Sequence, residues 1–149
     1  MADILINLHS QNPQGCPVPD HTSEYLETAE KNYKSGKFNK ENIFGLEFGY
    51  PADAWRFAEE RKRLLKSDTL IHGDYCLPNV ILNDWRFSGF IDVGNGGVGD
   101  KHVDIFWATW SLWFNLKTNK YTNYFIDAYG RDKIDNEVLR FVSVVEMFG

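Results

Sequence analysis

The stretch that decides the interpretation of this chain is Ile71-His72-Gly73-Asp74-Tyr75-Cys76-Leu77-Pro78-Asn79, followed further along by Gly89-Phe90-Ile91-Asp92-Val93-Gly94. His72, Asp74 and Asn79 have the spacing His-x-Asp-x-x-x-x-Asn, and Asp92 opens an Asp-x-Gly triplet. Carboxylate and amide oxygens are ligands that magnesium accepts, and a carboxylate can take a proton from a hydroxyl group. The joint spacing therefore predicts that a loop at 71–79 and the end of a strand pair at 80–94 bring these side chains together.

The surrounding pattern predicts an α+β fold that is mainly helical. Apolar segments at 80–82 and 87–91 flank Asn83-Asp84-Trp85, which indicates a small β-hairpin. A short strand is expected at 69–71, and the glycine-rich segment 94–99 is expected to form a flexible bend. Helices are expected over 3–9, 23–35, 51–66, 102–116 and 121–129, with a last helix capped by Asp135 or Asn136.

Composition narrows the classes of function. The 16 basic and 21 acidic residues give a net charge of −5, which argues against nucleic-acid binding and suits a cationic partner, with solubility as the plainer alternative. Cys16 and Cys76 lie far apart, so neither a disulfide framework nor a zinc cluster is expected. The N-terminus lacks a signal peptide's basic region, and the most apolar run, 105–116, is too short to span a bilayer. We therefore expect a cytoplasmic protein without a membrane partner.

The spacing of the central motifs is that of the catalytic loop and metal-binding triplet of kinases. In that chemistry a carboxylate takes or orients the proton of the attacking hydroxyl, while oxygen ligands hold magnesium on the phosphates. Asp74 is accordingly predicted to be the base, and Asn79 and Asp92 the magnesium ligands. His72, two residues before the base, is predicted to orient the loop from beneath it.

The sequence also resembles one family of phosphotransferases. His-Gly-Asp-x-Cys-Leu-Pro-Asn followed by Arg-Phe-Ser-Gly-Phe-Ile-Asp is similar to the aminoglycoside 3′-phosphotransferases, the kanamycin and neomycin kinases. The resemblance extends over nearly the whole chain through Leu8-His9-Ser10, Cys16-Pro17, Gly97-Val98-Gly99-Asp100-Lys101, Asp104-Ile105 and Glu146-Met147-Phe148. It implies transfer of the γ-phosphate of ATP, with Mg²⁺, to a sugar hydroxyl of an aminoglycoside antibiotic, and hence antibiotic resistance.

The resemblance also assigns roles to residues outside the central motifs. It implies that Asp104 supports the catalytic loop, and that Glu41 and Glu146, with Phe148, bind the substrate. The alternative for both glutamates is that they are solvated surface carboxylates. The chain departs from the family pattern at several positions: Asn95 replaces an expected arginine, Phe44 an expected carboxylate, Gly149 follows Phe148, and Trp107, Trp110 and Trp113 enrich one helix in aromatic residues.

A kinase further needs a glycine-rich loop and a lysine on its nucleotide phosphates, both from an N-terminal lobe. The sequence before His72 has no room for that lobe. Residues 1–149 are therefore predicted to form one C-terminal lobe, with the catalytic loop at 71–79, the metal-site hairpin at 80–94 and helices at 100–149. A separate N-terminal lobe is then a further partner, and we expect the isolated chain to transfer phosphate very weakly or not at all. A non-catalytic kinase-like remnant or binding module is the alternative.

A second motif allows a different interpretation. Gly94, Gly96 and Gly99 match Gly-x-Gly-x-x-Gly, the fingerprint of dinucleotide-binding folds. That fingerprint requires a second strand that ends in an acidic residue about 20 residues further on. The segment that follows is rich in tryptophan and predicted to be helical, which disfavours a dinucleotide site.

Overall fold

The structure is a computed structural model that describes residues 1–39 and 48–149. Its α-helices are α1 (Ala2–His9), α2 (His21–Lys34), α3 (Pro51–Arg61), α4 (Lys101–Leu116), α5 (Lys120–Tyr129) and α6 (Asn136–Val145). Its strands are β1 (Thr69–Ile71), β2 (Val80–Asn83), β3 (Arg86–Phe90) and β4 (Gly97–Gly99). The described residues therefore form the mainly helical α+β fold that the sequence predicts.

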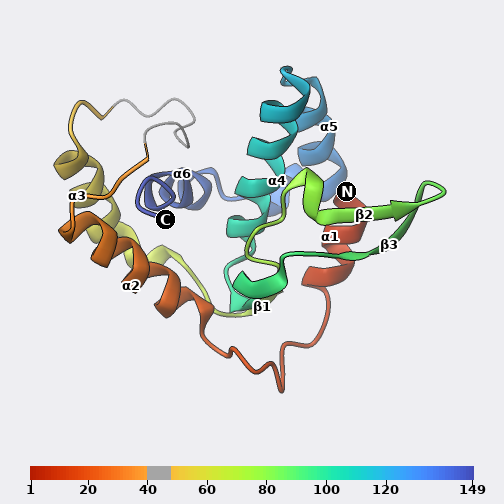
Figure 1. Cartoon of the computed structure of the whole chain (residues 1–149), viewed down its shortest axis with the longest axis horizontal. Helices are drawn as coiled ribbons and strands as arrows, with labels where there is room; N and C mark the ends of the chain where they lie inside the picture. Colours follow the sequence, from red (N-terminus) through yellow and green to blue (C-terminus); the bar gives the residue numbers. More distant parts are fainter. Residues whose placement is uncertain (40–47) are drawn as a thin grey trace.

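Helix α4 is the central element of the fold. In Figure 1 it lies between α2, α3 and α6 on one side and α1, α5 and the β2–β3 hairpin on the other. Val103 and Phe106 of α4 belong to the apolar cluster formed with α3 and α6. Ile105, Ala108 and Leu112 belong to a second cluster with α1 and α5. Because apolar side chains cover opposite faces of α4, the helix joins both halves of the core.

The predicted hairpin is present. Strands β2 and β3 are antiparallel, with Val80 opposite Phe90 and Asn83 opposite Arg86. The two residues between the strands, Asp84 and Trp85, have φ angles of 48° and 60°. Positive φ at both central positions is the backbone that two-residue hairpin turns favour.

The expectation of a flexible bend at 94–99 is wrong for its second half. Gly97–Gly99 forms β4, which pairs antiparallel with β1 and places Thr69 opposite Gly99. Glycine fits here because the chain packs closely: a Cβ on Gly97 would lie 2.9 Å from Val18 Cγ1. Both sheets in the described part of the chain are antiparallel, which excludes the parallel dinucleotide-binding arrangement there.

The ends of the helices largely follow sequence signals. Asp135 caps α6 by accepting from the backbone N–H groups of Glu137 and Val138, which settles the choice between Asp135 and Asn136. Helix α3 ends at Arg61, earlier than predicted, because residues 62–64 continue as a 3₁₀ turn. None of the helices in the described ranges is long and apolar enough to cross a membrane.

Candidate active site

A buried carboxylate in the first turn of α4 holds the candidate catalytic loop, residues 71–79. The Asp104 side chain is 0% exposed. Its Oδ2 accepts a hydrogen bond from the His72 backbone N–H and its Oδ1 one from the Gly73 N–H, both at 2.8 Å. Two N–H groups that would otherwise lie unpaired in the interior are therefore satisfied by one side chain.

Gly73 is required by the geometry of this loop. Its φ angle is +81°, and a Cβ at this position would lie 1.9 Å from the backbone oxygen of Asn95. Any other residue would collide with the segment that follows Asp92. The loop and the Asp-x-Gly segment are therefore packed backbone to backbone.

Asp74 and Asn79 are brought together as the spacing predicts. The Asn79 amide nitrogen donates to the backbone oxygen and to the Oδ2 of Asp74, both at 2.9 Å. Asn79 is buried, whereas Asp74 is half-buried and so keeps contact with solvent. Both bonds use the amide nitrogen of Asn79, so its oxygen is the end of the amide suited to hold a cation.

His72 joins the two motifs. Its Nδ1 accepts from the Asp74 backbone N–H at 3.3 Å, so its Nε2 carries the proton and donates to the Ile91 carbonyl at 3.0 Å. The imidazole is 3% exposed and contacts the ring of Phe90 edge to face. These contacts give His72 the position of an orienting residue beneath the loop.

Asp92 follows the hairpin at the same end of the fold. Its backbone is left-handed, with φ 56° and ψ 44°, and its side chain is exposed. The preceding residue, Ile91, donates its backbone N–H to the Asn79 carbonyl at 3.1 Å. Asp92 therefore follows directly on the residue that is bonded to the Asn79 backbone, and the facing of their side chains across a cleft stays a prediction.

The donor chemistry of this cluster suits magnesium. Asp74, Asn79 and Asp92 offer carboxylate and amide oxygens, the hard ligands that the ion prefers. Among the described residues, neither Asp74 nor Asp92 forms an ion pair with a lysine, arginine or histidine. The negative charge of these two carboxylates is therefore not neutralised by a basic side chain of the described residues, which suits the binding of a cation.

Glu146 lies in the interior, and its alternative interpretation as a solvated surface carboxylate is wrong. It is 4% exposed, and its Oε1 accepts from the Tyr25 hydroxyl at 2.9 Å and from the Trp107 Nε1 at 3.1 Å. Burial, with a smaller contribution from the negative charge of Asp74, raises the pKa of Glu146 to about 7 despite these two donors. Its substrate-binding role stays a prediction.

Phe148 is also buried, beside Glu146. Its ring contacts Tyr33 and Trp55 edge to face, and its backbone oxygen accepts from the Asn32 side chain at 2.8 Å. The chain end is therefore tied to α2 and α3. The remaining predicted substrate residue, Glu41, lies outside the described residues, as does Phe44.

Sequence reasoning missed the contacts of three further residues that support the site. His9 Nε2 donates to Asp104 Oδ2 at 3.1 Å, and its Nδ1 lies 2.8 Å from the Tyr129 hydroxyl. Tyr25, the partner of Glu146, is 121 positions away in sequence. Of these residues only His9 could have been found from the sequence, through the Leu8-His9-Ser10 pattern. Tyr25 and Tyr129 lie in no recognisable motif.

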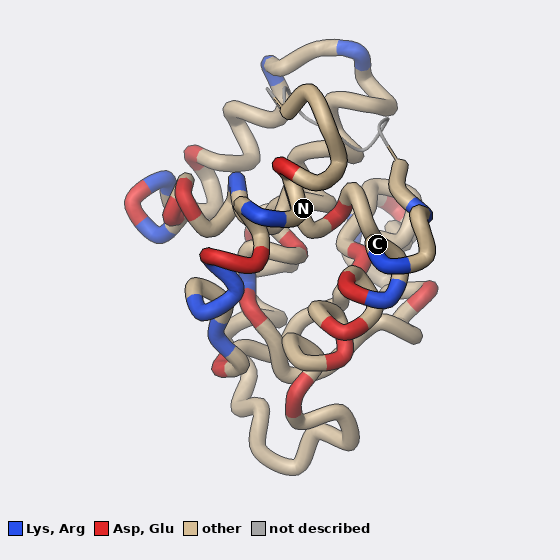
Figure 2. The backbone as a smooth tube through the Cα atoms, turned by 90° about the vertical axis from the view of Figure 1, so that its left-hand side faces the viewer, with Lys and Arg blue, Asp and Glu red and all other residues tan. Residues whose placement is uncertain are grey.

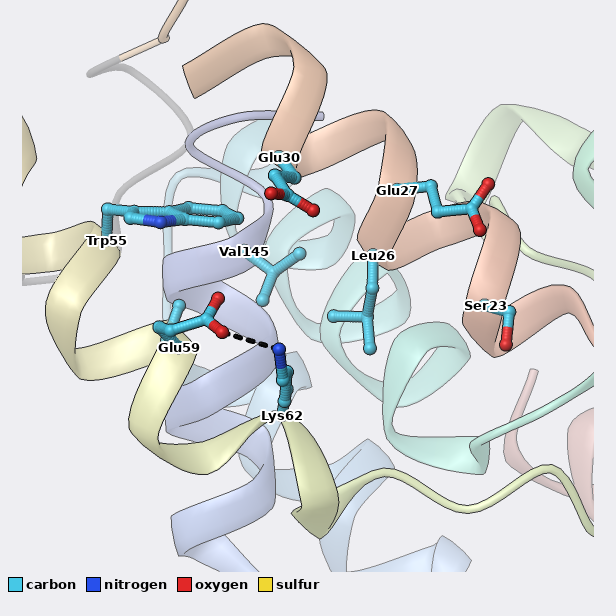
Figure 3. Close-up of a pocket in the computed structure, with 9 residues that line it drawn as sticks. Ser23, Leu26, Glu27, Glu30, Trp55, Glu59, Lys62 and Val145 are labelled. Atoms are coloured by element: carbon cyan, nitrogen blue, oxygen red, sulfur yellow. Dashed lines mark hydrogen bonds and ion pairs between the residues drawn. The ribbon is translucent and has the colours of Figure 1, made fainter. Parts of the chain in front are cut away.

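A pocket elsewhere in the fold is separate from this cluster. Figure 3 shows it between α2 and α3, with Glu27, Glu30 and Glu59 among its lining residues and Lys62 paired with Glu59. Its volume is about 210 Å³. The residues that line it include none of the predicted catalytic or metal-binding residues, so the pocket is not part of the candidate active site.

Comparison with known proteins places this geometry in a family. The model of the phosphotransferase enzyme family matches residues 1–142. The chain belongs to this family. It is 46% identical to a probable aminoglycoside 3′-phosphotransferase of Lactococcus lactis, over 100% of this chain and 57% of that protein. It is 30% identical to an aminoglycoside 3′-phosphotransferase of Streptomyces fradiae, over 99% of this chain and 58% of that protein. The chain thus spans little more than half the length of these curated relatives.

Solved structures support the same fold. An aminoglycoside phosphotransferase from Streptomyces rimosus, solved with ADP and streptomycin, matches 99% of this chain and 60% of its own with a TM-score of 0.78 at 21% identity. An aminoglycoside 3′-phosphotransferase of type VIII matches with a TM-score of 0.77 at 24% identity. The predicted fold class, that of an aminoglycoside phosphotransferase lobe with a small hairpin, is therefore confirmed.

Proposed function

We propose that this chain carries the phosphotransfer site of an aminoglycoside phosphotransferase, which transfers the γ-phosphate of ATP to a sugar hydroxyl and so confers antibiotic resistance. The observation that carries the proposal is the loop held by Asp104, in which Asn79 is bonded to Asp74. The relatives named above are aminoglycoside 3′-phosphotransferases, which supports the substrate class. ATP as the co-substrate fits the cytoplasmic location that the sequence predicts.

In this proposal each residue has a chemical task. Asp74 accepts or orients the proton of the attacking sugar hydroxyl, as its half-buried carboxylate allows. Asn79 and Asp92 would hold Mg²⁺, which supplies positive charge to the phosphate oxygens when bound. His72 and Asp104 position the loop through its backbone.

The acceptor is proposed to be a polycationic amino sugar. Asp74 lies unpaired with any basic side chain of the described residues, and the net charge of −5 attracts cations over longer distances. Individual exposed ion pairs contribute only about 0–1 kcal/mol each. The isolated chain should therefore bind a neomycin-type aminoglycoside weakly, and added salt should weaken binding further.

Titration calorimetry with neomycin at low ionic strength tests this proposal. We expect weak binding by the chain and clearly weaker binding by Asp74→Asn. A matched control is Asp127→Asn, which removes one negative charge from an exposed position on α5. Absence of binding, or equal loss in both variants, would contradict a specific amino-sugar site and favour the non-catalytic alternative.

A further inference from the structure

The joined ends of α4 and α5 expose a group of large apolar side chains. These side chains lie on both sides of the turn at 117–119 and are between 37% and 59% exposed: Trp113, Phe114, Leu116, Tyr121 and Tyr124. In Figure 1 this end of the two helices projects at the top of the view, beyond α6 and the β2–β3 hairpin. Clustered exposed apolar side chains of this kind mark interaction sites.

Two lysines lie against these rings. Lys117 Nζ is 4.1 Å from the centre of the Phe114 ring, and Lys120 Nζ is 5.7 Å from that of the Tyr124 ring. Both distances fall within the range of a cation–π contact. Among the described residues neither lysine forms an ion pair, so both positive charges are open to an anionic partner. We call these two lysines and the exposed apolar side chains around them the α4–α5 tip.

The charge of this region is opposite to that of the whole chain. Residues 105–126 contain Lys117 and Lys120 and form the longest stretch of the sequence without an aspartate or glutamate. The segment therefore carries a charge of +2 in a chain whose net charge is −5. Because an anionic partner is repelled by the chain as a whole, the tip is the part of it that such a partner can approach.

The chemistry of the tip favours a lipid surface over an acidic protein. Tryptophan and tyrosine combine an apolar ring with an N–H or O–H group, which concentrates them at the level of lipid headgroups. Lysines beside such rings attract anionic lipids. The tip is the projecting end of two packed helices (Figure 1), and an end of this shape enters a deformable lipid surface more readily than a preformed acidic recess.

We infer that the α4–α5 tip binds the surface of membranes that contain anionic lipids, with its rings at the headgroup level and its lysines on the lipid phosphates. The cytoplasmic leaflet, which faces the predicted location of the chain, is the anionic one. The expectation of no membrane partner concerned leader and spanning segments, and contact with the surface alone requires neither. The inference is independent of the proposed phosphotransfer function.

Cosedimentation of the chain with lipid vesicles tests the inference. Vesicles of equal parts phosphatidylcholine and phosphatidylserine should bind the chain, and vesicles of phosphatidylcholine alone should bind it several-fold more weakly. Added salt should weaken binding to the mixed vesicles, because it screens the lysines from the lipid charge. Absence of binding to the mixed vesicles, or equal binding to both kinds at low salt, would overturn the inference.

Charge variants locate the contact on the chain. Lys117→Gln combined with Lys120→Gln should weaken binding to the mixed vesicles about 25-fold, because each lysine near such a surface contributes a factor of about five, or about 1 kcal/mol. The matched control, Lys31→Gln combined with Lys133→Gln, removes the same charge from exposed positions outside the tip and should change binding little. Equal loss in the two double variants would mean that net charge alone drives adsorption, and would contradict a site at the tip.

Apolar variants and hydrogen–deuterium exchange test the role of the rings. Leu116→Gln and Tyr124→Gln should each weaken binding several-fold but change the melting temperature little, because both side chains are exposed and glutamine suits a helix. Peptides over 113–124 should exchange more slowly when mixed vesicles are added, and peptides over α3 should not. Unchanged exchange at 113–124 in the bound chain would refute the placement. Dimers that form without lipid and are lost in Leu116→Gln would identify a second copy as the occupant and refute the lipid assignment.

Discussion

Asp104 is the side chain on which the shape of the candidate catalytic loop depends most directly. Its carboxylate is fully buried and accepts hydrogen bonds from two backbone N–H groups and from the His9 side chain. Asp104→Asn puts an amide N–H group opposite a backbone donor. Because hydrogen bonds to charged groups contribute about 1.5–3 kcal/mol each, we expect a loss of about 3 kcal/mol in the free energy of unfolding.

Urea denaturation of Asp104→Asn measures this loss. Asp127→Asn, which changes an exposed aspartate, should change the unfolding free energy by less than about 0.5 kcal/mol. Exchange of the loop amides at 72 and 73 should accelerate in Asp104→Asn only. A loss as small as that of the surface control would mean that Asp104 does not hold the loop.

Glu146 makes the stability of the chain depend on pH. Its pKa rises from 4.5 in the unfolded chain to about 7 in the folded one, chiefly through burial. Between these values the unfolded chain releases the proton while the folded chain keeps it, so stability falls as the pH rises from about 4.5 to 7. The difference in pKa corresponds to about 3 kcal/mol.

Glu146→Gln should remove this dependence, because a glutamine can accept the hydrogen bonds from Tyr25 and Trp107 without carrying charge. Unfolding free energies of the two proteins at pH 5 and pH 8 are compared. The variant should gain stability relative to the natural chain at pH 8. Parallel behaviour of the two proteins across this range would contradict the buried position of the carboxylate.

The site residues that could be predicted from the sequence are those that lie close together along the chain. His72, Asp74 and Asn79 lie within eight positions of one another, so their convergence follows from one loop. The burial of Glu146 depends on Tyr25, which is 121 positions away, and on Trp107. Such a contact requires the packing of α2, α4 and the C-terminal segment, and no local pattern of residues encodes it.

The strands differ in how clearly their sequences predict them. The apolar segments of β2 and β3 flank a run of turn residues, so the hairpin is predictable. β4 is Gly-Val-Gly, and glycine is depleted in strands, so its sequence favours a bend. In the fold it pairs with β1, where Val18 and Ile71 pack so closely against Gly97 and Gly99 that neither glycine position could hold a side chain. Tertiary packing thus overrides local preference at this strand.

The turn of the hairpin stores backbone strain that a substitution can relieve. Trp85→Gly relieves a left-handed backbone at a residue that is 95% exposed. The isolated chain should become more stable by about 1 kcal/mol, since left-handed backbone costs a non-glycine residue about 1–2 kcal/mol. Thermal denaturation checks this, with Tyr124→Gly, in the middle of α5, as a contrasting variant that should lower the melting temperature. A destabilised Trp85→Gly would show that the indole packs within this chain.

Two properties of the whole chain bear on its function: its net charge and the share of its relatives' length that it spans. Figure 2 shows acidic and basic residues interspersed along the backbone on the side that it displays. The net charge of −5 supports attraction of a polycation rather than a fixed geometry for it. The chain spans 57% of its Lactococcus lactis relative, and the proposal assigns to its described residues the loop with Asp74 and the predicted metal ligands.

Phosphorylation of neomycin tests whether the loop held by Asp104 is a phosphotransfer site with Asp74 as its base. Transfer of labelled γ-phosphate from ATP, with Mg²⁺, is followed for the isolated chain and for a chimera that joins it to the part of the Lactococcus lactis relative that it does not cover. We expect little or no transfer by the isolated chain, clear transfer by the chimera, and a loss of about 100-fold or more on Asp74→Asn, the range that a general base contributes. A folded chimera that transfers no phosphate, or that transfers it equally well with Asp74→Asn, would contradict this role of Asp74.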